Sequence, residues 1–113
     1  SETTMPVFYL VHLNYDYEES MKPFSSPSQA LRYIRDTFEV DAPITDPAFA
    51  RAVDDSYASG DWRGLTIHAI GGETGRLIHL DLGRLAAAAR SNHALMAFEA
   101  DMRSKLGPQP AAA

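Results

Sequence analysis

The chain opens with a regular alternation of residue types. Residues 6–17 alternate with a period of two and are rich in β-branched and aromatic side chains. This pattern predicts a β-strand. Because twelve residues is long for one strand, we expect its last residues to leave the sheet. Residues 18–25 are mostly polar and are expected to form a loop.

Two helices are expected after this loop. Ser26 is a suitable N-cap, a proline follows it, and apolar residues then recur at helical spacing, which predicts a helix over 27–39. Thr45 or Asp46 can cap a second helix over 46–58, which again has a proline near its start.

A β-hairpin follows the second helix. Two apolar runs, 64–70 and 76–82, are separated by the glycine-rich segment 71–75, which predicts two antiparallel strands joined by a tight turn. A one-residue slip would move every side chain to the wrong face, so we expect the register that makes the apolar face continuous. That register places His68 directly opposite His79. It gathers six apolar residues on the face toward the helices, namely Leu65, Ile67, Ala69, Ile78, Leu80 and Leu82.

A long helix is expected to complete the chain. Its apolar spacing begins at Asp81 or Gly83, and it ends at Gly107, which a proline follows. An alanine run gives it high helix propensity. The pair Ser91-Asn92 is a weak point where the helix can kink or restart.

The element order β-α-α-β-β-α predicts an α+β fold. We expect a two-layer domain with a three-stranded, mainly antiparallel sheet and helices on one face. Residues 6–106 are expected to form this single domain, with a disordered N-terminus over 1–5 and a disordered tail over 107–113.

The second face of the expected sheet carries an unusual mixture of residues. A sheet face in contact with water is normally polar, whereas this one holds four large apolar residues and three histidines. We therefore expect something to cover it, with a second subunit, a partner protein or the chain's own C-terminal helix as the alternatives. The predicted interface residues are Phe8, Leu10, His12, His68, Ile70, Leu77 and His79.

The histidines of this face support a second hypothesis. His12, His68 and His79 are of the residue type that binds Zn²⁺, Ni²⁺ or Cu²⁺, and histidine also serves as an acid or a base near neutral pH. No local spacing concentrates these histidines in the sequence, so the simpler alternative is that they are ordinary residues of a half-exposed sheet.

Charge is unevenly distributed along the 113 residues. The net charge is −5 at pH 7, and residues 1–61 hold 11 acidic but only 4 basic side chains. An acidic chain repels phosphate backbones, so direct binding to nucleic acid is not expected. Acidic residues can instead attract a basic protein surface or imitate a row of phosphates, although they also simply maintain solubility. The residues of this predicted acidic patch are Asp16, Glu18, Glu19, Asp54, Asp55 and Asp61.

Composition narrows the range of functions further. The chain has no cysteine, which excludes disulfides, thiolate metal sites and cysteine nucleophiles. No serine elbow or buried lysine pattern suggests another nucleophile, and no cofactor or membrane segment is expected. The expected function is therefore a small cytoplasmic, non-enzymatic protein-interaction module, in the form of a regulatory or inhibitor protein, with a homodimer as one expected state. The alternatives are a histidine-dependent metal-binding protein or enzyme, and an acidic inhibitor that occupies a nucleic-acid-binding surface of its target.

Overall fold

The computed structural model describes residues 7–108 of the chain. The predicted disordered segment 1–5, and residues 109–113 of the predicted disordered tail 107–113, lie outside the described residues. None of the helices within residues 7–108 is both long enough and apolar enough to cross a membrane. The elements along the chain are β1 (Val7–Tyr15), β2 (Glu18–Phe24), α1 (Pro27–Thr37), α2 (Pro47–Ser59), β3 (Leu65–Gly71), β4 (Leu77–Leu80), α3 (Leu82–Ala88) and α4 (Asn92–Leu106).

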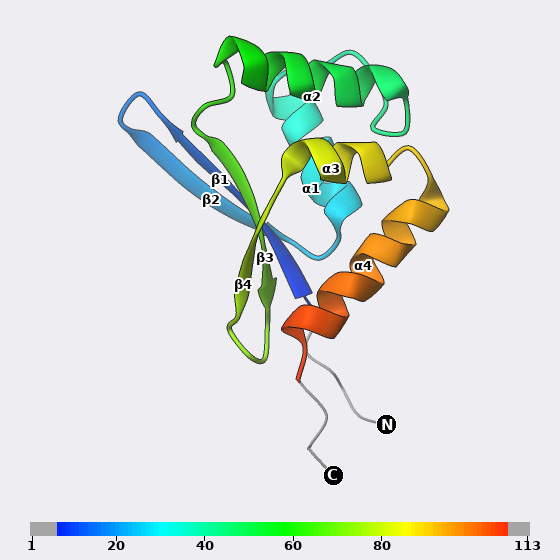
Figure 1. Cartoon of the computed structure of the whole chain (residues 1–113). Coiled ribbons are helices and arrows are strands. Elements are labelled where there is room, and N and C mark those ends of the chain that lie inside the picture. Colours follow the sequence, from blue (N-terminus) through cyan, green and yellow to red (C-terminus); the bar gives the residue numbers. More distant parts are fainter. Residues whose placement is uncertain (1–6, 109–113) are drawn as a thin grey trace.

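The strands form one antiparallel sheet in the order β2-β1-β3-β4 (Figure 1). The α+β class and the antiparallel pairing are thus confirmed, but the prediction of three strands was wrong, because residues 18–24 form a fourth strand and not a loop. Strand β1 lies between β2 and β3, so β2 and β4 are the two edges of the sheet.

The extra strand pairs with β1 through a two-residue turn at Asp16 and Tyr17. Both turn residues have positive φ angles, 44° and 70°, which is the backbone of the tight turns that suit the twist of a hairpin. Strand β2 could not be predicted from the sequence, because almost all of its side chains are exposed. A strand that buries neither face shows no alternation of apolar and polar residues. Its charged residues and Pro23 are typical of an edge strand, where the missing proline N–H can face solvent.

The helix starts follow their predicted caps, whereas the C-terminal helix is divided. The side chain of Ser26 accepts a hydrogen bond from the backbone N–H of Gln29 at 3.2 Å, and Asp46 caps α2 in the same way. The single helix expected up to residue 106 is instead two helices. The chain restarts at the predicted weak point, where Ser91 caps α4 by accepting from the backbone N–H of Ala94.

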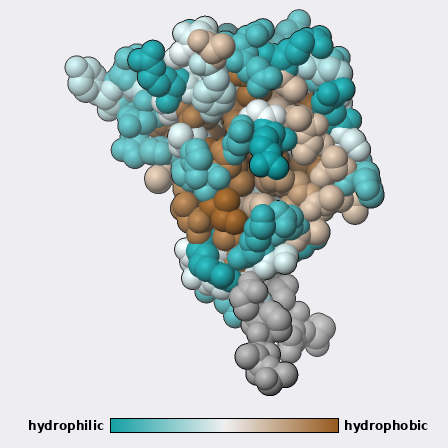
Figure 2. Space-filling model, viewed as in Figure 1, coloured by the Kyte–Doolittle hydropathy of each residue, from teal (hydrophilic) through white to brown (hydrophobic). Residues whose placement is uncertain are grey.

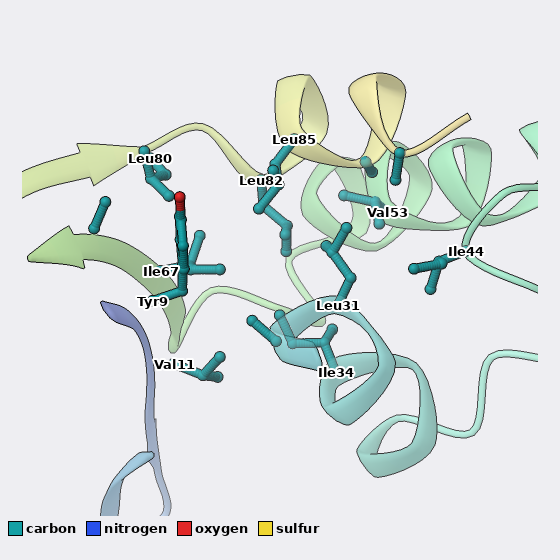
Figure 3. Close-up of a cluster of buried hydrophobic side chains, with 14 of the residues drawn as sticks. Tyr9, Val11, Leu31, Ile34, Ile44, Val53, Ile67, Leu80, Leu82 and Leu85 are labelled. Carbon is teal, nitrogen blue, oxygen red and sulfur yellow. The ribbon is translucent and has the colours of Figure 1, made fainter. Parts of the chain in front are cut away.

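The core lies between one face of the sheet and the helices. Along β3 and the first five residues of β1 every second residue is buried, and these residues belong to the same buried cluster as the apolar sides of the helices. Figure 3 shows the strand side chains and the helix side chains pointing toward one another. The labelled members of this core are Tyr9, Val11, Leu31, Ile34, Ile44, Val53, Ile67, Leu80, Leu82 and Leu85.

The expected register of the β3–β4 hairpin is confirmed. Ile67 pairs with Leu80, and His68 pairs with His79. One residue of the predicted face departs from the expectation. Leu82 is buried, but it lies in the first turn of α3, because Asp81 caps that helix and ends the strand two residues earlier than expected.

The β3–β4 turn is fastened to the end of α4. The hydroxyl of Thr74 donates a hydrogen bond to the carbonyl oxygen of Leu106 at 2.6 Å, and the guanidinium of Arg76 donates to the carbonyl oxygen of Gly107 at 2.9 Å. Gly71 lies at the closest approach, where a Cβ atom would collide with the Leu106 carbonyl. Only glycine lets the two backbones come this near.

Candidate functional site: an open sheet face

The face of the sheet that points away from the core is the candidate site. In an antiparallel sheet, residues that pair directly share a face, so the registers of all four strands define this face completely. It includes three residues that the sequence analysis did not place there, Glu19, Met21 and Pro23, because β2 was expected to be a loop. The open sheet face, as we name it, consists of Phe8, Leu10, His12, Asn14, Glu19, Met21, Pro23, Thr66, His68, Ile70, Leu77 and His79.

Among the described residues, nothing covers this face. All seven predicted interface residues lie on it, and each is half-buried or exposed, whereas most of their neighbours on the core face are buried. Met21 and Leu77 keep 55% and 54% of their surface exposed, against 1% for Ile67 on the core face. In Figure 1 the helices lie to the right of the sheet, and no helix lies on its left side.

The alternative that the C-terminal helix covers the open sheet face is wrong. Helix α4 packs on the core face, where the ring of Phe98 lies 6.4 Å from the ring of Tyr9. The hydroxyl of Tyr9 is surrounded by this packing, and desolvation together with the nearby Glu99 raises its pKa to about 12. The four helices therefore leave the second sheet face to solvent or to a partner.

Two histidines stand side by side on the open sheet face. The ring centroids of His68 and His79 are 5.0 Å apart, with their planes at 60°. The backbone N–H of Gly71 bonds to the carbonyl of Arg76, so by alternation the 68–79 pair is one of the non-hydrogen-bonded pairs, in which side chains approach most closely.

The environment of His68 favours the neutral imidazole. Partial burial lowers its pKa below the usual 6.5, and the neighbouring His79 and His12 lower it further, because a charge on either one repels a charge on His68. The Nδ1 atom of His68 is buried and has no hydrogen-bond partner within the chain. A buried nitrogen of this kind is normally completed by a water, an ion or a partner.

The third histidine of the face is engaged elsewhere. The Nε2 atom of His12 lies 2.8 Å from a carboxylate oxygen of Glu19, across the β1–β2 pair. This contact orients the His12 ring beside the carboxylate of Glu19, which lies on the same face. Among residues 7–108, no group of three or more histidine, cysteine, aspartate or glutamate residues is placed to hold a metal ion.

The residues of the predicted acidic patch lie on three parts of the fold. Asp16 and Asp61 line one shallow hollow together with Arg63. Glu18 and Glu19 line another, beside the start of β2. The remaining two, Asp54 and Asp55, lie on the exposed side of α2.

A groove runs along the other side of the β4 edge. It has a volume of about 490 Å³ and lies between β4 and the helices α3 and α4. Ile78, Phe98 and Met102 supply its apolar lining, with charged residues at its rim. Figure 2 shows hydrophobic residues gathered over this part of the β3–β4 hairpin, continuous with the edge of the sheet.

The chain was compared with protein-family models, with curated proteins and with solved structures. None of the three comparisons finds a match.

Proposed function

We propose that the chain is a non-enzymatic protein-interaction module, and that its first partner is a second copy of itself. In this proposal the domain has two layers, with helices on the core face of the sheet and the open sheet face left for pairing. The observation that carries the proposal is the exposure of large apolar side chains on that face, with Met21 and Leu77 more than half exposed. A face-to-face dimer buries such a surface with one self-complementary patch.

Charge favours a second copy over a basic partner at this face. The chain carries a net charge of −5, yet the open sheet face holds a single carboxylate, that of Glu19, near one end of β1 and β2. This carboxylate lies 2.8 Å from the Nε2 atom of His12. Two such faces therefore meet with one acidic side chain from each chain, whereas the other acidic residues lie outside the face.

The size of the face suits a small interface. Strands about 4.8 Å apart and about six residues at about 3.3 Å each give a four-stranded face of roughly 19 by 20 Å. This flat projection of roughly 400 Å² is half the ~800 Å² of accessible surface that each partner buries in a standard interface. Side-chain relief raises the accessible area, so the face lies at the lower end of the stable range.

The experiment compares two matched substitutions by sedimentation velocity at pH 7.5. Leu77→Asp places a charge on the open sheet face, whereas Met96→Asp places one on α4 at a residue that is equally exposed, 60% against 54%. The proposal expects the dimer to be lost in Leu77→Asp and retained in Met96→Asp. A dimer that survives Leu77→Asp unchanged would place the interface elsewhere.

A second candidate function is supported by the tip of the β1–β2 hairpin. Tyr17 is fully exposed in a left-handed conformation that a bulky residue rarely adopts, and Asp16 and Glu18 flank it. An exposed aromatic ring between carboxylates is suited to insert into a basic surface. This supports the alternative of an acidic inhibitor that occupies the nucleic-acid-binding surface of a target.

A further inference from the structure

We infer that His68 and His79 form one half of a zinc site that a second copy of the chain completes. The inference rests on the proposed dimer, because residues 7–108 of a single chain offer only these two ligands at this place. A closed structural zinc site takes four ligands in a tetrahedron. Two histidines from each copy supply that number with nitrogen ligands alone.

The spacing of the two rings already suits one shared ion. With Zn–N bonds of about 2.0–2.1 Å and a tetrahedral angle, two imidazoles on one zinc have centroids roughly 5 Å apart. The rings of His68 and His79 are 5.0 Å apart. They project from directly paired residues of a hairpin whose neighbouring pairs belong to the core, so the backbone holds this spacing.

The electrostatic environment of His68 is compatible with this role. Zinc binds neutral imidazole, and partial burial together with the neighbouring His79 and His12 lowers the pKa of His68, which favours the neutral form. The Nδ1 atom of His68 is buried within the chain, so the nitrogen offered to an ion between the two sheets is Nε2. His12 is not counted as a ligand, because Glu19 holds its Nε2 atom.

A two-fold axis can bring the two half-sites together without strain. Pro23, Leu10, His68 and His79 lie in one row across the four strands. An axis along this row stacks the row on its own copy while all four strands overlap. Packed sheets lie about 10 Å apart, so the midplane is about 5 Å from each backbone, within reach of an imidazole from either side.

Such an ion would couple metal binding to dimerisation. Zinc that binds only the dimer tightens it by mass action, roughly 100-fold when free zinc is 100 times its dissociation constant. Competition with protons would remove the effect in mild acid, since each ligand must be neutral.

The experiment measures the dimer dissociation constant by sedimentation equilibrium at pH 7.5, in EDTA and in zinc chloride, with magnesium chloride as the ionic control. Equilibrium dialysis gives the zinc content. The variant is His79→Ala, at an exposed position that leaves the core intact, and the matched control is His93→Ala, at an exposed histidine of α4. The inference expects one zinc per two chains, at least about tenfold tighter pairing in zinc, and loss of both in His79→Ala only.

The possible outcomes separate the zinc site from the dimer itself. A dimer that is the same in EDTA and in zinc, or that binds no zinc, overturns the zinc site and leaves the proposed dimer standing. One zinc per chain, without tighter pairing, also overturns the shared site. A chain that is monomeric in both solutions overturns both proposals. Retention of the zinc effect in His79→Ala would place the metal elsewhere and overturn the assignment.

Discussion

His68 and His79 face each other across the last two strands, with their rings 5.0 Å apart on the side of the sheet that no helix covers. Their neighbours along the strands, Ile67 and Leu80, form another direct pair on the opposite face and are buried in the core. The register that buries the apolar pair therefore also brings the two imidazoles together. Any charge on these rings must be accommodated beside the apolar side chains of Leu10, Ile70 and Leu77.

This relationship predicts that mild acid lowers the free energy of unfolding and weakens the dimer. The pKa of His68 is lowered in the folded state, so the unfolded chain takes up the proton first as the pH falls below about 6.5. The contribution of the neutral His68 to the free energy of unfolding is fully present above this pH, and it is lost as the pH falls through the folded-state pKa. Pairing should weaken over the same range, because a proton on His68 would bring a charge into the interface.

The measurement is urea unfolding and sedimentation velocity at pH 7.5 and pH 5.5. The wild type should lose both stability and dimer at pH 5.5. His68→Gln should show a smaller pH effect than His93→Gln, the control on α4. An equal pH effect in the two variants would show that His68 is not the responsible group.

The two faces of β3 should respond differently to truncation. Ile67 is 1% exposed in the core, so Ile67→Ala should lower the free energy of unfolding by about 2–4 kcal/mol. Ile70→Ala changes a residue of the open sheet face. At concentrations where the chain is monomeric, it should lower the free energy of unfolding by much less than Ile67→Ala does. Its main effect should be to weaken the dimer. Urea unfolding at low concentration checks the first value. Equal losses in the two variants would contradict the assignment of the faces.

The contact between the β3–β4 turn and α4 requires a residue without a side chain at Gly71. Gly71→Ala places a Cβ atom against the carbonyl oxygen of Leu106 and should cost about 2 kcal/mol or more. Gly75→Ala is the control. Gly75 has a φ of 72° but open space around it, so only the backbone conformation is penalised, at roughly 1 kcal/mol. Thermal unfolding should therefore show the larger loss for Gly71→Ala, and the reverse order would contradict the packing described here.

If the acidic residues recruit a basic partner, salt should slow the association. Exposed charges are screened beyond about 8 Å at 0.15 M ionic strength, so the association rate should fall as salt rises. Stopped-flow mixing of the chain with a basic protein at a series of salt concentrations provides the rate. Asp16→Asn with Asp61→Asn should reduce the salt dependence. A rate that ignores salt would leave solubility as the role of these residues.

The sequence predicted the position of those residues whose burial in the core requires one particular strand register. Burial of Ile67 and Leu80 requires one register, and the same argument located His68 opposite His79. Strand β2 carried no such signal, because an exposed edge strand needs no apolar alternation. Because the prediction lacked β2, it also did not assign Met21 to the open sheet face, where Met21 is one of the two most exposed large apolar residues.

For the helices, too, features set by neighbouring residues were predicted, whereas features set by long-range packing were not. Caps such as Ser26 and Asp46 are local, so the starts of α1 and α2 were predicted within one residue. Which face α4 would choose depends on long-range packing with Tyr9. The sequence therefore left open whether the second face was covered, and the structure decided it.

The most direct test of the account is the mass of the wild-type chain in solution. Sedimentation equilibrium at pH 7.5, over a range of chain concentrations and with EDTA present, reports whether the open sheet face pairs without any metal. The account predicts a particle of twice the 12.4 kDa chain mass, dissociating at low concentration. A particle of 12.4 kDa at every concentration would contradict it.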